Sequence, residues 1–259
     1  MDFKTLLVED KNGIITITFN RLQVLNSIND LLLEELNLAL DEAEQNTACK
    51  FIILQGKQGY FCTGMDFNEL PDQEINDNID ASTAIKSPFM ETIKRFTLIP
   101  KIIISNVDGK VMAGGMGLVA ASDFVVATSR SEFSLSEALW GLIPAMVMPY
   151  LIRRIGFQMA YRLTLTTLPI NARKAYDINL ADELSDNPDN IIRQLWLRMS
   201  KLETETIAEI KQYFRNLWII NNDMENYAVS EITKLLFNPM VRERIHNFVQ
   251  YRKFPWDQE

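Results

Sequence analysis

The chain has 259 residues, 47% of them hydrophobic, and a formal net charge of −8. This length and composition suffice for one large core, and the lack of a long basic run argues against nucleic acid as a partner. No apolar stretch is long enough to cross a membrane, and the first residues lack the basic-then-apolar form of a signal peptide. We therefore expect a cytoplasmic protein that does not engage a membrane.

Histidine and cysteine are scarce, which narrows the chemistry. The one histidine, His246, would have to serve any Ser-His-Asp triad, and a multi-histidine metal site is excluded. Its surroundings, RERIHNFVQYRKF, are more typical of a helix surface. Cys49 and Cys62 are too few for a disulfide framework, and we expect both to be buried small residues. Acid–base chemistry is therefore expected from carboxylates, with no metal.

Two short apolar runs open the chain. Residues 5–9 and 14–19 are rich in β-branched side chains and are separated by a turn that ends in an Asn-Gly pair. Such a pair between two such runs predicts an antiparallel β-hairpin. After the hairpin, Ser27 or Asn29 can cap a helix that runs to about residue 44.

The next strand leads to the first glycine of interest. Residues 51–54 are apolar on both faces and predict a central strand. Residues 60–67, YFCTGMDF, then place Gly64 at a strand-to-helix transition. Residues 69–87 are polar and predict a mobile surface loop, for which a lid over a site and a plain solvated insertion are both open.

A second glycine-bearing turn follows a helix and a strand. Pro88 predicts the start of a helix that Pro100 ends, and residues 102–107 form a β-branched strand. The stretch 111–123, VMAGGMGLVAASD, then begins a helix at a glycine pair that includes Gly114. Unpaired N–H groups at such a helix start attract anions, and glycine lets a substrate carbonyl come close. The alternative is a tight turn with close helix packing.

The second half of the chain is increasingly helical in pattern. Residues 124–128 and 133–136 predict two short strands, and the second strand ends at Glu137. Helices are expected after it, and residues 191–252 are mostly helical in pattern, with an interruption at Pro239.

Strand, glycine-bearing turn and helix thus occur twice, and FSLSEALWGLIPA, which contains Glu137, follows the second turn. Together these features resemble the crotonase (enoyl-CoA hydratase/isomerase) superfamily. The resemblance implies an α/β protein with the crotonase fold, a ββα spiral core of repeated strand-strand-helix turns with a C-terminal helical region. It implies a spiral core over residues 1–187 and a helical trimerisation or lid region over residues 188–259.

The resemblance also assigns site residues. In that superfamily two backbone N–H groups form an oxyanion hole for a thioester carbonyl, and the matching positions here are Met65 and Gly114. Glu137 matches a catalytic glutamate; the alternative is a carboxylate favoured by a helix N-terminus. Asp66, beside one oxyanion donor, is a second catalytic candidate, although acidic residues are common at that family position without catalytic duty.

One position departs from the hydratases of the superfamily. They carry a first catalytic glutamate three residues beyond the second oxyanion glycine, and Gly117 stands there instead. A water-adding enzyme with two glutamates is therefore not expected, and Glu137 would carry most of the proton transfer. Apolar neighbours are expected to raise the pKa of Glu137 by desolvation. Those neighbours are Phe133, Leu135, Leu139 and Trp140.

Three segments point to one group within the superfamily. AGGMGLVAASD, the LIRRIG that follows FSLSEALWGLIPA, and the terminal FPWDQE resemble the 3-hydroxy-3-methylglutaryl-acyl-carrier-protein dehydratases of bacterial polyketide β-branching cassettes. This resemblance implies a lyase that removes water from the 3-hydroxy-3-methylglutaryl thioester on an acyl carrier protein to give the 3-methylglutaconyl thioester. A CoA-dependent isomerase or decarboxylase of the same fold and a non-catalytic crotonase-fold binding protein are the alternatives.

The same resemblance implies partners. An acyl carrier protein and further copies of the chain, in a homotrimer or a dimer of trimers, are expected, with no cofactor beyond the carrier's phosphopantetheine. Leu25 would line the pantetheine channel and Trp140 would contact the substrate, although core packing explains either residue as well. The basic pair Arg153-Arg154 could attract the phosphopantetheine or an acidic carrier, or form a solvated face.

Overall fold

A six-stranded sheet forms the centre of the fold. The computed structural model describes residues 3–69, 87–218 and 220–257. The strand order in this sheet is β1-β2-β3-β5-β7-β10. The β1–β2 pair is antiparallel, and the other pairs are parallel. The strands are β1 (Leu6–Lys11), β2 (Ile14–Phe19), β3 (Phe51–Gln55), β5 (Ile102–Val107), β7 (Phe124–Ala127) and β10 (Glu183–Leu184).

The sequence-based expectations for the N-terminal part are confirmed. The hairpin turns at Asn12 and Gly13, which have φ angles of 54° and 80°, as a tight hairpin turn requires. Helix α1 (Asp30–Gln45) is capped by Asn29, whose side chain accepts a hydrogen bond from the Leu32 N–H at 2.9 Å. Strand β3 lies between β2 and β5 and is central, as its apolar faces predict.

A second, smaller sheet carries the two glycine-bearing turns. Its order is β4-β6-β8-β9, with parallel β4–β6 and β6–β8 pairs and an antiparallel β8–β9 pair. Its members have two or three residues each, too few for a strand pattern to show in the sequence, and the sequence did not predict β6 or β9. The strands are β4 (Tyr60–Cys62), β6 (Lys110–Met112), β8 (Glu132–Ser134) and β9 (Ile170–Asn171).

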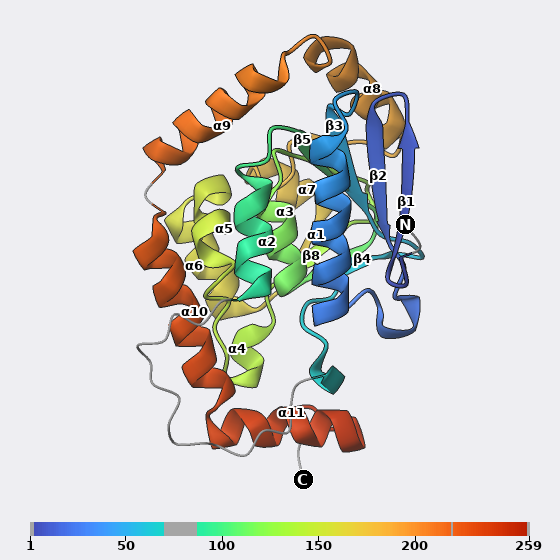
Figure 1. Ribbon diagram of the computed structural model, residues 1–259. Helices are drawn as coiled ribbons and strands as arrows, with labels where there is room; N and C mark the ends of the chain where they lie inside the picture. The colour runs from blue at the N-terminus through green and yellow to red at the C-terminus, as the bar shows by residue number, and fades with distance from the viewer. Residues whose placement is uncertain (1–2, 70–86, 219, 258–259) are drawn as a thin grey trace.

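Helices α1, α2 and α3 pack side by side against the large sheet (Figure 1). Ser87 caps α2 by accepting a hydrogen bond from the Met90 N–H, and Phe89, Ile93 and Phe96 are buried. The remaining helices of the core follow α3 in the chain. The elements are η1 (Leu22–Val24), η2 (Phe67–Glu69), α2 (Pro88–Phe96), α3 (Gly114–Ala121), α4 (Glu137–Trp140), α5 (Met148–Ile155), α6 (Phe157–Thr166) and α7 (Ala172–Asp177).

Four C-terminal helices run around the rim of the core, from α8 and α9 at the top of Figure 1 through α10 to α11 at the bottom. Two ion pairs attach them to the core: Lys211 Nζ lies 2.6 Å from Asp123 Oδ2, and Lys94 Nζ lies 2.7 Å from Glu225 Oε2. Pro239 begins α11 as its first residue rather than interrupting a longer helix. The helices are α8 (Pro188–Met199), α9 (Thr204–Leu217), α10 (Asn222–Leu236) and α11 (Pro239–Tyr251).

Several single-residue expectations can now be placed. Cys49 and Cys62 are both buried, as expected, and His246 is exposed on α11. The predicted loop at 69–87 falls largely on residues 70–86, which lie outside the described residues. None of the described helices combines the length and apolarity needed to cross a membrane.

Candidate active site

Three strands of the small sheet end at the same edge, because β4, β6 and β8 run parallel. Met65 follows β4, Gly114 follows β6, and Glu137 follows β8. The structure therefore brings together three of the residues that the sequence singled out. Ligands of parallel sheets commonly bind beyond the carboxyl ends of the strands, and we take this edge as the candidate active site.

The first turn is attached to the start of α1 by a short parallel β-bridge between Ile28 and Met65. The Ile28 N–H donates to the Gly64 carbonyl at 2.7 Å, and the Asp66 N–H donates to the Ile28 carbonyl at 2.9 Å. Successive amides of an extended chain point to opposite sides, so the Met65 N–H faces away from Ile28. This N–H has no acceptor among the described residues.

The second turn touches the first. A Cβ built on Gly64 would lie 3.1 Å from the Gly114 nitrogen and 2.6 Å from Ala113 Cβ, so only glycine fits at this close approach. Gly114 is the first residue of α3, and within the described parts of the chain its N–H also lacks an acceptor. Two unpaired amide donors are thus placed in adjacent turns, the arrangement that an oxyanion hole needs.

Glu137 is the first residue of α4, and its surroundings are apolar. Its Oε2 is buried and has no hydrogen-bond partner among the described residues. Burial raises the pKa of Glu137 to about 7, against a smaller lowering by backbone hydrogen bonds at Glu137 and Ser136. Such a carboxyl can both accept and donate a proton near neutral pH.

Three of the four residues expected to bury Glu137 are themselves buried. Phe133, Leu135 and Trp140 are buried, but 40% of Leu139 is exposed.

The side chains around Gly117 leave no space for a larger residue at this position. A Cβ at this position would lie 2.9 Å from Phe89 Cζ and 3.2 Å from Val147 Cγ2. The place where a hydratase of the superfamily holds its first glutamate is thus filled by apolar side chains. Phe89 also lies beside Gly114, 3.6 Å from where its Cβ would be. The sequence offered only a buried helix position for Phe89, so its place in the site was missed.

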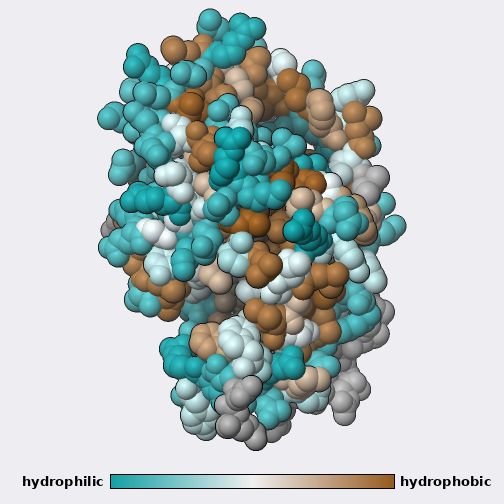
Figure 2. Space-filling model, turned by 180° about the vertical axis from the view of Figure 1, so that it is seen from behind, coloured by the Kyte–Doolittle hydropathy of each residue, from teal (hydrophilic) through white to brown (hydrophobic). Residues whose placement is uncertain are grey.

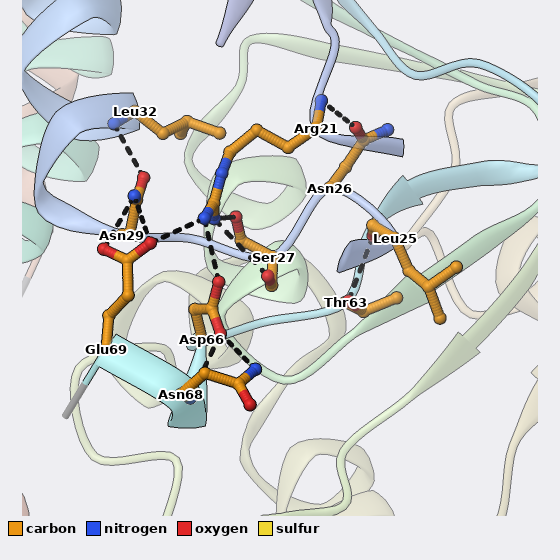
Figure 3. Close-up of polar contacts among 10 residues, drawn as sticks. All are labelled: Arg21, Leu25, Asn26, Ser27, Asn29, Leu32, Thr63, Asp66, Asn68 and Glu69. Carbon is orange, nitrogen blue, oxygen red and sulfur yellow. Dashed lines mark hydrogen bonds and ion pairs between the residues drawn. The ribbon is translucent and has the colours of Figure 1, made fainter. Parts of the chain in front are cut away.

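Asp66 differs from Glu137 because both of its carboxylate oxygens are engaged (Figure 3). Oδ2 accepts from Arg21 Nη2 at 2.9 Å, and Oδ1 accepts from the backbone and side-chain nitrogens of Asn68 at 3.1 and 2.9 Å. Burial acts to raise the pKa of Asp66, but the hydrogen bonds from Asn68 and Arg21 outweigh it and lower the pKa. Asp66 is therefore held as a carboxylate.

The two residues with an expected substrate contact have different surroundings. Leu25 is 43% exposed with a left-handed backbone, and its carbonyl accepts a hydrogen bond from Thr63 Oγ1 at 3.0 Å (Figure 3). Trp140 is buried in an aromatic cluster, with ring centroids 5.0 Å from Phe67 and 5.2 Å from Phe248. Core packing accounts for Trp140, whereas the exposed side chain of Leu25 is free to contact a ligand.

The basic pair on α5 is engaged within the chain. Arg153 Nη2 donates to the Ala120 carbonyl at 2.8 Å, and Arg154 Nη2 donates to the Ser122 carbonyl at 2.9 Å. These carbonyls lie at the C-terminal end of α3, where cations are favourable. The pair thus holds α5 to α3, while Arg153 is also exposed to solvent, and contact of the pair with a carrier stays a prediction. No cluster of three His, Cys, Asp or Glu side chains that could hold a metal ion occurs in the described ranges.

Comparison with known proteins identifies the family of the chain. Residues 9–259 match the enoyl-CoA hydratase/isomerase family. The chain is 34% identical over 257 residues to the bacillaene synthase dehydratase PksH of Bacillus subtilis, covering 99% of this chain and 98% of that protein. It is 27% identical to the trans-2-decenoyl-[acyl-carrier-protein] isomerase of Streptococcus mutans, covering 84% and 83% of the two chains.

A solved structure is similar over nearly the whole chain. The crystal structure of a polyketide biosynthesis enoyl-CoA hydratase from Bacillus subtilis superposes with a TM-score of 0.84 at 33% identity, covering 98% of this chain and all of that one. Sequence and fold therefore agree, and the chain belongs to the enoyl-CoA hydratase/isomerase family, with the crotonase fold.

Proposed function

We propose that this protein is a hydro-lyase that removes water from the 3-hydroxy-3-methylglutaryl thioester of an acyl carrier protein and forms the 3-methylglutaconyl thioester. One observation carries the proposal: a carboxyl with a pKa near 7, one buried oxygen of which has no partner among the described residues, lies at the same sheet edge as two unpaired amide donors. This combination suits removal of a proton next to a thioester carbonyl.

The reaction needs one acid–base group and one oxyanion hole. The Glu137 carboxylate takes a proton from C2, and the enolate oxygen accepts hydrogen bonds from the N–H groups of Met65 and Gly114. The protonated Glu137 then donates to the hydroxyl at C3, so the C3–O bond breaks, the double bond forms and water leaves. No step needs a metal or a redox cofactor.

Two observations support dehydration by a single carboxylate. Phe89 and Val147 fill the space beside Gly117, so a second acid–base group has no room there. The similarity to the bacillaene synthase dehydratase of Bacillus subtilis, at 34% identity over almost the whole chain, also points to a polyketide dehydratase. We further propose that the thioester is bound to an acyl carrier protein. Its phosphopantetheine passes Leu25, and the carrier protein docks on the surface outside the site.

The test offers the purified protein the 3-hydroxy-3-methylglutaryl thioester on an acyl carrier protein and, separately, on CoA. Mass spectrometry is expected to show loss of one water, faster with the carrier-bound substrate. No loss with either thioester, while the protein is folded, contradicts the proposal and favours a non-catalytic binding protein.

Isomerisation or decarboxylation is the second candidate, because a single carboxyl can also move a proton between C2 and C4 or support loss of carbon dioxide. The similarity to a trans-2-decenoyl-[acyl-carrier-protein] isomerase favours keeping it. Incubation with the 3-methylglutaconyl thioester separates the two: loss of carbon dioxide or a shifted double bond favours the second candidate, whereas a gain of one water, the reverse of the proposed reaction, favours dehydration.

We also propose a homotrimer or a dimer of trimers. Large apolar side chains are exposed along α6, including Phe157, Tyr161 and Leu165, and along α9, including Phe214 and Leu217. Hydrophobic surface also gathers over the middle of the face opposite to that of Figure 1 (Figure 2). Exposed apolar surface of this kind is typical of protein–protein contacts. Sedimentation velocity is expected to give three or six times the chain mass.

A further inference from the structure

Arg21 is a buried arginine beside the first turn of the site, and its donors converge on that turn. The residue is 7% exposed. Its Nη1 donates to the Ser27 carbonyl at 2.5 Å, and its Nη2 pairs with Asp66 Oδ2 at 2.9 Å and with Glu69 Oε1 at 2.8 Å (Figure 3). None of these atoms belongs to an oxyanion donor or an acid–base group of the proposed reaction.

The two inner contacts of Arg21 lie on opposite strands of one β-bridge. Ser27 directly precedes Ile28, and Asp66 directly follows Met65, while Ile28 and Met65 form the bridge. The guanidinium therefore spans the bridge beside its backbone hydrogen bonds. Because its planar fork has a fixed geometry, it fixes the distance and the twist between the two strands.

The outer contact extends the network to α1. Glu69 accepts from Arg21, and both of its carboxylate oxygens also accept from Asn29 Nδ2 at 2.8 Å. The side-chain oxygen of Asn29 in turn caps α1 by accepting from the Leu32 N–H. The start of α1, the bridge and the residues after Met65 are thus held as one polar unit.

We propose that Arg21 is a positioning residue that sets the direction of the Met65 N–H toward the thioester oxygen. The inference rests on the proposed oxyanion hole of Met65 and Gly114. The Gly114 N–H needs no positioning side chain, because Gly114 is fixed at the start of α3 and by the close approach of Gly64. Asp66 serves here as the anchor of Arg21.

The test compares Arg21→Met and Arg21→Lys with a control that breaks a buried ion pair elsewhere. The control is Lys211→Met, because Lys211 Nζ pairs with Asp123 at 2.6 Å, beyond the end of α3 opposite to Gly114. A non-hydroxylated probe, acetoacetyl-pantetheine, forms an enolate by giving up its C2 proton to Glu137 or buffer. The ultraviolet absorbance of the bound enolate reports on the oxyanion hole directly.

Wild type and Lys211→Met are expected to stabilise the enolate alike. Arg21→Met is expected to lose most of the enolate absorbance and to lower kcat about 10- to 100-fold, with KM changed much less, since a displaced donor affects the charged state most. Arg21→Lys, which keeps the charge but not the fork, is expected to lie between them. If Arg21→Met does not fold, Arg21→Lys is compared with wild type in its place.

Full enolate absorbance in folded Arg21→Met or Arg21→Lys overturns the inference, and so does an equal loss in Lys211→Met. No enolate with wild type also overturns it, because no oxyanion hole then exists. The failure of the proposed function is distinguishable: enolate absorbance that depends on Arg21, without dehydration of the hydroxyacyl thioester, supports the positioning role and rejects the substrate.

Discussion

Asp66 and Glu137 lie at the same edge of the small sheet, yet their surroundings oppose each other. Asp66 is 5% exposed and accepts hydrogen bonds on both oxygens, which lower its pKa. Glu137 has a buried oxygen without a partner in the described part of the chain, and burial raises its pKa to about 7. The environments of two residues of one chemical kind thus shift their pKa values in opposite directions.

The contrast extends to the two halves of the site. The half around Met65 is polar and held by Arg21 and its partners. The half around Gly114 is apolar, with Phe89 against α3, and Ala113 has a φ of 47°, which non-glycine residues rarely adopt. Hydrogen bonds and ion pairs hold the first half, whereas close apolar packing holds the second.

Replacing Glu137 by Gln is expected to have the largest effect. The amide keeps the shape but cannot transfer the proton, so kcat should fall about 10³-fold with KM nearly unchanged. The measurement is steady-state dehydration followed by mass spectrometry. A fall of less than tenfold in a folded variant would give the acid–base role to another group.

Asp66→Asn tests whether Asp66 has a structural role, and the measured quantity is the free energy of unfolding. Arg21 would lose its buried charge partner and keep only the half-exposed Glu69, so the free energy of unfolding should fall by about 3 kcal/mol. Urea denaturation measures this loss. The matched control is Asp41→Asn, which breaks the more exposed ion pair with Arg95 and is expected to cost less than about 1 kcal/mol. Equal losses would refute a buried, structural role for Asp66.

The pH dependence of stability separates the two carboxyls again. The pKa of Glu137 rises from 4.5 to about 7 on folding, so the folded state binds more protons between these values and stability falls as pH rises. Between about pH 5.5 and 7.5 the loss should be about 2 kcal/mol, and Glu137→Gln should abolish it. The lowered pKa of Asp66 acts in the other direction, since its contribution is lost only as pH falls through that pKa. A flat wild-type curve in this window contradicts the raised pKa.

Ala113→Gly is expected to have the smallest effect and the opposite sign. Glycine relieves the backbone strain at φ 47°, partly offset by greater freedom in the unfolded chain, so stability should rise by about 1 kcal/mol. Ala120→Gly, inside α3, is the control and should lose at least about 1 kcal/mol. Thermal denaturation compares the two, and a loss in both variants would mean that Ala113 is not strained.

Local signals in the sequence sufficed for much of the fold. The Asn-Gly turn, the cap at Asn29 and the apolar run of β3 each act within a few residues, so the hairpin, α1 and the central strand were predictable. The small sheet was not fully predictable, because its strands are too short to show a period.

The site shows the same division. Met65, Gly114 and Glu137 were named from motifs, and the parallel β4, β6 and β8 bring them to one edge. Arg21 was missed, because its contact with Asp66 spans 45 residues of sequence.

The pH profile of the single-turnover dehydration rate tests the central claim, that Glu137 and not Asp66 transfers the proton. Wild type should show a rate that rises with pH through an apparent pKa of about 7 and then levels, because the carboxylate form is the base. Asp66→Asn should be slower but keep this limb, whereas Glu137→Gln should lose it. A limb that persists in Glu137→Gln, or that disappears in Asp66→Asn, would contradict the claim.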